Sequence, residues 1–230
     1  MQKPKADGSR TLQRIRGRAL PALALGFFVL LVVGVILAPA ETRLGNLVKL
    51  VYVHGALVWT GLLCFSSAGL LGLTAVGMHY LFGSVERSRT WYYGTEAAGL
   101  ASLGVWIVYV ISSMAVTGLT WGQLIAWNEP RVRATAFILV AAIVVFVVSK
   151  LVNHRDFTAA ANILMGIVPW VMVRQAGVIR HPVDPIGGSG SMAIQGFYWL
   201  IVFTVAGLAA TWIAWLWVGA ELRDKTNSDG

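Results

Sequence analysis

The sequence predicts an all-α membrane protein with six transmembrane helices. Three observations carry this prediction: 57% of the 230 residues are hydrophobic, only 12% are charged, and the mean hydropathy is +0.71. Soluble proteins carry roughly 25% charged residues. The chain therefore lacks the polar surface of a soluble protein, and a single membrane-embedded domain accounts for its length.

The chain divides into a basic segment (1–18), a membrane domain (19–219) and a short polar tail (220–230). Pro4 and Gly8 predict little regular structure in the basic segment. The first apolar run, 20–37, ends in Ala38-Pro39-Ala40, which is similar to a signal-peptide cleavage site. A signal peptide has an apolar region of only ~7–15 residues, whereas a spanning helix needs ~20. We therefore expect a retained first helix.

The remaining five apolar runs complete the set of six. The second run is longer than a bilayer requires, since at ~1.5 Å per residue it exceeds a hydrocarbon core of ~30 Å. We expect this helix to tilt, to break near its glycines or to project beyond the membrane. The fifth run is short and contains Asn162 and Pro169, which are typical of a packed or kinked helix. The predicted helices are 20–37, 47–82, 97–116, 134–151, 157–173 and 193–218.

The distribution of basic residues predicts the orientation of the chain. Six helices place both termini on one side, and that side collects twelve of the 18 lysines and arginines. Cytoplasmic loops are enriched in Lys and Arg, so both termini are predicted to be cytoplasmic. The short segment 121–131, between the third and fourth helices, then lies on the outer face. Membrane topology accounts for the net charge of +8, and nucleic-acid binding is not expected because the basic residues form no continuous face.

Two of the four histidines, His54 and His181, fall on the predicted outer side. Two histidines are too few for a closed zinc site, but they match the two axial positions of a haem iron. The alternative is that His54 is a packing residue and His181 an ordinary loop residue. The single cysteine, Cys64, excludes an internal disulfide and a Cys-x-x-Cys motif.

The outer segment contains tryptophans and arginines with two possible roles. Trp121 and Trp127 are either interfacial anchors or a flat platform for a flat ligand. Arg131 and Arg133 are either charges that flank a helix or, together with Arg180, partners for the carboxylates of a ligand. A guanidinium group pairs a carboxylate through two hydrogen bonds, which would suit haem propionates.

Several motifs resemble, in order, those of the CcmC-type haem-handling proteins of cytochrome c maturation, within the cytochrome c assembly family. The second helix begins with Lys49-Leu-Val-Tyr52-Val-His54-Gly, similar to the family's Tyr-x-His segment. Trp121-Gly-x-x-x-x-Trp127-Asn128 is similar to the family's tryptophan-rich motif, although Asn128 replaces an aspartate and Leu124 and Ile125 replace tryptophans. His181 follows the proline-containing fifth helix. The resemblance covers roughly 20–218.

The resemblance implies an inner-membrane protein that binds haem b at its outer face. It implies His54 and His181 as axial ligands of the iron, and Trp121 and Trp127 as the porphyrin platform. The partners implied are a haem chaperone of the CcmE type and the ABC-type transporter subunits of the same system. Such a protein holds and donates haem and is not an enzyme. The alternative is a polytopic permease or transporter subunit whose histidines and tryptophans are structural.

Overall fold

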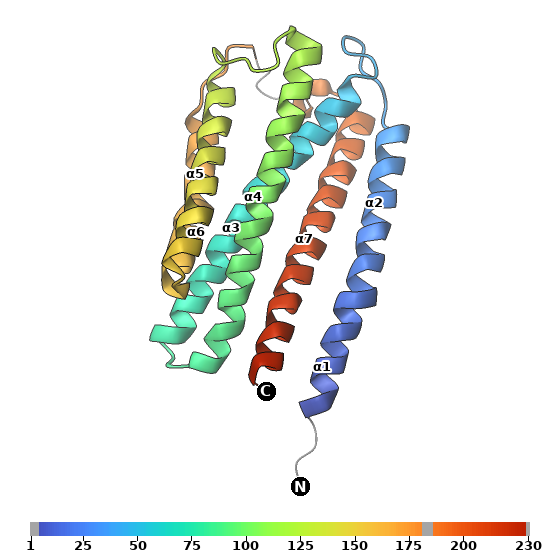
Figure 1. Cartoon of the computed structure of the whole chain (residues 1–230). Coiled ribbons are helices and arrows are strands. Elements are labelled where there is room, and N and C mark those ends of the chain that lie inside the picture. Colours follow the sequence, from blue (N-terminus) through green and yellow to red (C-terminus); the bar gives the residue numbers. More distant parts are fainter. Residues whose placement is uncertain (1–4, 181–185, 229–230) are drawn as a thin grey trace.

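The fold is a bundle of long helices (Figure 1). The structure, a computed structural model, describes residues 5–180 and 186–228. Six helices are long and apolar enough to cross a membrane, which confirms the predicted fold class at that level. The elements are α1 (Lys5–Arg14), the π-helical turn η1 (Ile15–Ala19), α2 (Leu20–Leu37), α3 (Val48–Tyr80), α4 (Val85–Trp121), α5 (Pro130–Val152), α6 (Arg155–Gln175), the 3₁₀ turn η2 (Gly187–Ser189) and α7 (Met192–Ser228).

The basic N-terminal segment differs from the prediction, because it is helical from Lys5 onward and continues through η1 into α2. Gly8 lies inside α1, where a glycine costs roughly 1 kcal/mol relative to alanine. The segment is also held by α7: the guanidinium of Arg16 lies 4.3 Å from the centre of the Trp215 ring. Pro4 lies outside the described residues. Contact with α7 therefore stabilises a helical conformation in this segment, although its local composition does not favour one.

Four helices, α4 to α7, extend beyond the predicted apolar runs, α6 by only two residues at each end. α4 begins at Val85, before the predicted start at 97, because no proline lies between Val85 and Ala97 and the helix continues through the single glycine there, Gly94. It ends where Gly122 adopts a left-handed conformation, with φ of +70°, as helix C-termini commonly do. α5 begins at Pro130, a residue favoured in the first helical turn. α7 continues to Ser228 through the polar residues that follow its apolar part.

Helix α3 occupies the centre of the bundle and packs against α4, α6 and α7. It runs unbroken and obliquely behind α4 (Figure 1). Of the outcomes expected for its length, a break at the glycines is therefore excluded. In the most apolar stretch of α3, 56% of the residues are buried, whereas in that of the helix that contains α2 only 6% are buried. The core is thus built around α3, whereas α2 lies at the edge, against α7.

Small residues bring α3 close to its neighbours. A Cβ atom built on Gly72 would lie 2.9 Å from the backbone oxygen of Ala159 in α6, and one on Gly69 would lie 3.2 Å from Cα of Gly166. Gly61 lies against the ring of Trp106 in α4, where a Cβ would approach to 2.7 Å. Close backbone approach at glycines is the usual basis of helix packing in membranes, where lipid removes the hydrophobic driving force.

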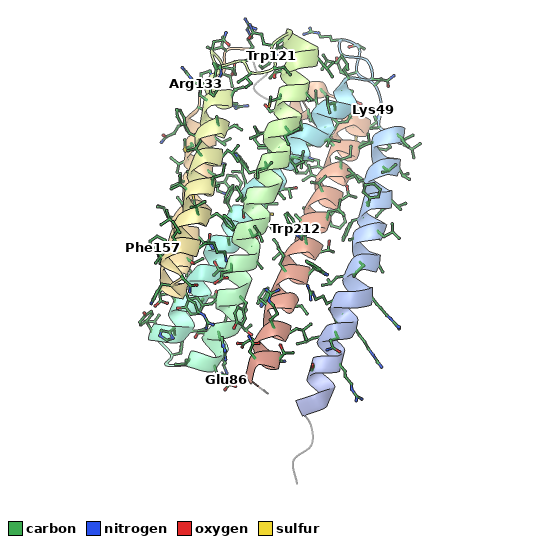
Figure 2. The ribbon with its side chains drawn as sticks, viewed as in Figure 1. Lys49, Glu86, Trp121, Arg133, Phe157 and Trp212 are labelled. Atoms are coloured by element: carbon green, nitrogen blue, oxygen red, sulfur yellow. The ribbon has the colours of Figure 1, made fainter. Side chains whose placement is uncertain are left out.

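The bundle has two distinct ends. Lys5 of α1 and the C-terminal end of α7 lie at one end, which we call the terminal end (Figure 1). Trp121, Arg133 and Lys49 lie at the opposite end, which we call the tryptophan end (Figure 2). The path of the described chain thus places the start of α1 and the end of α7 at the same end of the bundle.

Candidate functional site

The tryptophan motif forms a compact loop at the end of α4. The Thr117 hydroxyl donates to the carbonyl of Leu124 at 2.8 Å, and the Glu129 amide donates to the carbonyl of Ala126 at 2.9 Å. Ala126 is fully buried, whereas Trp127 is 57% exposed. Hydrogen bonds and the buried Ala126 therefore hold the loop against the bundle, while the side chain of Trp127 is exposed.

Glu129 connects this loop to the segment that follows α6. Its side chain is fully buried, and its carboxylate accepts hydrogen bonds from the backbone amides of Ile179, at 3.2 Å, and Arg180, at 2.8 Å. A buried carboxylate requires such donors. Arg180 directly precedes residues 181–185, which lie outside the described part of the chain. Glu129 thus holds the described end of the loop that contains His181 beside the tryptophan loop.

A cavity of about 560 Å³ lies near the tryptophan end, within the 300–1,000 Å³ typical of ligand pockets. Five of the helices, α3 to α7, contribute to its wall. Its lining joins a histidine, two arginines and several aromatic rings to a short segment around η2. These residues are His54, Trp59, Tyr109, Arg131, Trp170, Arg174, Ile186, Gly187, Tyr198 and Trp199, among others.

His54 is the imidazole of this cavity, and it is only 6% exposed. Its Nδ1 lies 3.1 Å from the hydroxyl oxygen of Ser112, and that hydroxyl donates to the carbonyl of Tyr109 at 2.7 Å. Because the Ser112 proton is used in this way, Nδ1 is assigned as the donor to Ser112. The lone pair is then on Nε2. A hydrogen bond at the other ring nitrogen is the usual means of orienting a metal-ligating histidine.

Three indoles form one side of the cavity. The ring of Trp59 in α3 lies 5.9 Å from that of Trp170 in α6 and 6.1 Å from that of Trp199 in α7, centre to centre. The Trp170 indole nitrogen donates to the Ser66 hydroxyl at 2.8 Å. Gly55 leaves room for the Tyr198 ring, which would lie 3.0 Å from an added Cβ. The rings are therefore packed in defined positions and form a broad apolar surface.

Arg131 and Arg174 supply the positive charge of the lining. The Nε atom of Arg131 is buried and has no hydrogen-bond partner among the described residues. Leaving a charged donor without a partner is costly. An anionic group in the cavity would supply the missing acceptor.

The structure brings together only some of the predicted site residues. His54 and Arg131 share the cavity, whereas Trp121, Trp127, Arg133 and Arg180 are not among its lining residues. Arg133 and Arg180 are exposed. His181 lies outside the described residues, although Ile186 and Gly187, just beyond the undescribed stretch, do line the cavity.

Sequence reasoning missed Glu129 as a structural residue and missed Trp59, Trp170 and Trp199 as cavity residues. One signal was available. Trp170 and Arg174 are four residues apart in α6, so they share one face of the helix, and both line the cavity. The convergence of Trp59 and Trp199 on Trp170 depends on how α3, α6 and α7 pack, which the spacing of single residues does not show.

No protein-family model matches the chain. The lining chemistry is therefore the guide to function. Within the described residues, no three His, Cys, Asp or Glu side chains are grouped as a metal site. The cavity instead offers one buried imidazole, two guanidinium groups and an aromatic wall, a set suited to a flat, largely apolar ligand that carries negative charge.

Proposed function

We propose that this protein holds haem b near the tryptophan end of its bundle and presents it to a partner, as part of cytochrome c assembly. Haem would be cargo, and we propose no enzymatic activity. One observation carries the proposal: the buried imidazole of His54, two arginines and an aromatic wall line the same cavity. The motif resemblance described above points to the same ligand.

The described residues fit the chemistry of haem. Haem presents an iron that accepts imidazole nitrogen, a flat apolar ring and two carboxylates. Nε2 of His54 is the ligand proposed for one axial position. The three indoles of Trp59, Trp170 and Trp199 supply apolar and stacking contacts, worth about 0.5–1.5 kcal/mol per ring pair beyond area burial.

The second axial ligand is proposed to be His181. The described residues next to this histidine support the assignment, because Glu129 fixes the Arg180 amide and Ile186 borders the cavity. The loop is thus held at one end and lines the cavity at the other.

The propionates are proposed to pair first with Arg131, whose Nε needs an acceptor, and with Arg174. Arg133 and Arg180 are exposed at the same end, where they would contact the propionates from the rim or bind a partner. That Trp121 and Trp127 form the porphyrin platform remains a prediction. Exposed Trp127 is well placed to meet a partner protein as haem leaves.

The orientation and partners belong to the same proposal. The twelve basic residues that the sequence assigns to one side would place the terminal end in the cytoplasm of an inner, or plasma, membrane. The tryptophan end would then face the periplasm or the outside. There a haem chaperone of the CcmE type would receive the haem, with ABC-type transporter subunits as further partners.

The test is the absorption spectrum of the protein purified with haem. Two neutral imidazoles give a six-coordinate low-spin iron with sharp visible bands on reduction. His54→Ala and His181→Ala should each lose this spectrum and regain it with added imidazole. His79→Ala and His154→Ala are the matched controls, because neither residue lines the cavity.

Two results would contradict the proposal. Wild-type protein that binds no haem would favour the permease alternative, in which the cavity residues are structural. Folded His54→Ala and His181→Ala proteins that keep the wild-type spectrum would refute the assigned ligands.

A further inference from the structure

A second hollow, of about 200 Å³, lies toward the terminal end and uses none of the residues of the first cavity. One face of α4 lines it through Tyr93, Glu96 and Leu100. The last turns of α5 contribute Ser149 and Lys150, among others, and α7 contributes Leu216, Ala220 and Arg223. α5 and α7 do not pack against each other in the described chain. The hollow therefore lies over α4, between α5 and α7, and α6 closes part of it through Thr158, Asn162 and Met165.

Positive charge collects at the polar edge of this hollow. Lys150 and Arg223 line it, and Lys150 approaches Glu96 only to 3.8 Å. The hydroxyl of Tyr93 accepts from the Nε of Arg89 at 3.3 Å and from a guanidinium nitrogen of Arg155 at 3.4 Å. Four cations thus surround the edge.

Carboxylates lie near these cations in equal number, but not every cation is paired with one. Asp224 pairs with Arg89, and Glu96 pairs loosely with Lys150. Glu221 instead accepts from the Thr90 hydroxyl and the Trp217 indole, and Asp156 accepts from the Tyr80 and Tyr92 hydroxyls. Arg223, which lines the hollow, therefore forms no ion pair in the described part of the chain, and its guanidinium group is open to an anionic ligand.

Ser149 supplies an independent sign of a ligand. The residue is only 8% exposed, it lines the hollow, and its hydroxyl oxygen has no hydrogen-bond partner among the described residues. A serine within a helix commonly bonds the carbonyl four residues earlier, as Ser102 does with Ala98. An unpartnered buried hydroxyl costs about 1–3 kcal/mol, which a polar ligand in the hollow would recover.

Apart from Thr158 and Asn162 of α6, the rest of the lining is apolar. Leu100 is 37% exposed, and with Val145, Phe146 and Leu216 it forms an apolar strip beside the charged edge. The arrangement places positive charge near the end of the bundle and apolar surface toward its middle. A phospholipid has the same order of groups: an anionic phosphate, then ester oxygens, then acyl chains.

We infer that this hollow is a binding site for one anionic phospholipid of the leaflet that surrounds the terminal end. The headgroup phosphate lies at Lys150 and Arg223, the Ser149 hydroxyl bonds a phosphate or ester oxygen, and an acyl chain follows the strip beside Leu100. Basic pockets between transmembrane helices on the cytoplasmic side are known to select such headgroups. The site is independent of haem binding.

The test is native mass spectrometry of the full-length protein in mild detergent, titrated with phosphatidylglycerol or with phosphatidylcholine of the same acyl chains. We expect one phosphatidylglycerol to bind in preference to phosphatidylcholine. Each basic residue near a membrane surface contributes about fivefold in affinity. Lys150→Gln and Arg223→Gln should each weaken phosphatidylglycerol binding by about that factor.

Arg87→Gln is the matched control, because Arg87 is exposed near the start of α4 but does not line the hollow. This variant should retain the wild-type preference. Ser149→Ala separates ligand binding from folding: it should weaken phosphatidylglycerol binding without lowering the unfolding temperature, since its hydroxyl bonds nothing in the described protein. Inorganic phosphate should not displace the lipid.

Three results would overturn the inference. The first is equal binding of the two lipids. The second is an equal loss of binding in Arg87→Gln, which would indicate only a diffuse surface charge. The third is displacement by millimolar inorganic phosphate, which would make the hollow a simple anion site.

Discussion

Single buried polar residues determine how the loops at the tryptophan end are held. Glu129 immediately precedes α5 but caps no part of its own helix with its side chain. Its carboxylate instead accepts two backbone amides from the segment after α6. From the sequence, Glu129 was only a carboxylate near the tryptophan motif. Its role depends on a contact between segments that are fifty residues apart, and local spacing carries no information about such contacts.

Glu129→Ala should release the segment 177–180. Hydrogen bonds to a charged group contribute about 1.5–3 kcal/mol, so protection of the Ile179 and Arg180 amides should fall by at least about tenfold. Hydrogen exchange measured by mass spectrometry would detect the change. Glu86→Ala is the control, because Glu86 is exposed at the opposite end. Unchanged exchange in Glu129→Ala would show that other contacts hold the segment.

At the scale of the elements, hydropathy predicted each spanning helix but not its ends. Apolar runs mark the part of a helix that lies in lipid, whereas backbone hydrogen bonding continues until a breaker occurs. α4 therefore starts at Val85 and ends at Trp121, just before Gly122, well outside the apolar run. Pro169 remains inside α6, as the sequence predicted. Hydropathy did not predict the helix in the N-terminal segment, because this helix is stabilised by a contact with Trp215, about 200 residues further along the chain.

The glycines of α3 offer a test of the packing between elements. Gly72→Ala would place a Cβ 2.9 Å from the Ala159 carbonyl oxygen, and overpacking of this kind costs about 1–3 kcal/mol. Gly77→Ala, in the same helix, meets nothing within 4 Å, and it should stabilise the helix by roughly 0.5–1 kcal/mol. Unfolding in a detergent titration would measure both variants. Equal shifts of the same sign would contradict the close approach of α3 and α6.

At the scale of the whole molecule, the positions of the two ends were predictable and the composition of the cavity was not. Counting helices places 121–131 opposite both termini, and the structure agrees (Figures 1 and 2). The cavity draws on five helices, so its aromatic wall follows from their packing. His54 and Arg131 were found because motif and charge patterns marked them individually.

The proposed sidedness can be tested by labelling single cysteines in a Cys64→Ser background. Cysteines at Gln123 and Gly188, both exposed near the tryptophan end, should react with an impermeant reagent added from outside. A cysteine at exposed Glu86 should react only after permeabilisation. Glu86 is preferred to nearby Ser88, whose side chain is only 1% exposed and would be hard to label. Outside labelling at Glu86 would reverse the proposed orientation.

The contrast between α2 and α3 has a consequence for how the chain can change over evolutionary time. Most of α2 faces away from the bundle and contacts mainly α7, so most of its positions need only be apolar. At the positions that face away from the bundle, exchange among leucine, valine and phenylalanine alters no packing partner in the described chain. At Gly61, Gly69 and Gly72 of α3, even one added carbon meets a neighbouring helix. These two helices, both apolar enough to span a membrane, should therefore diverge at very different rates, and the faster one would obscure kinship between distant members of one lineage.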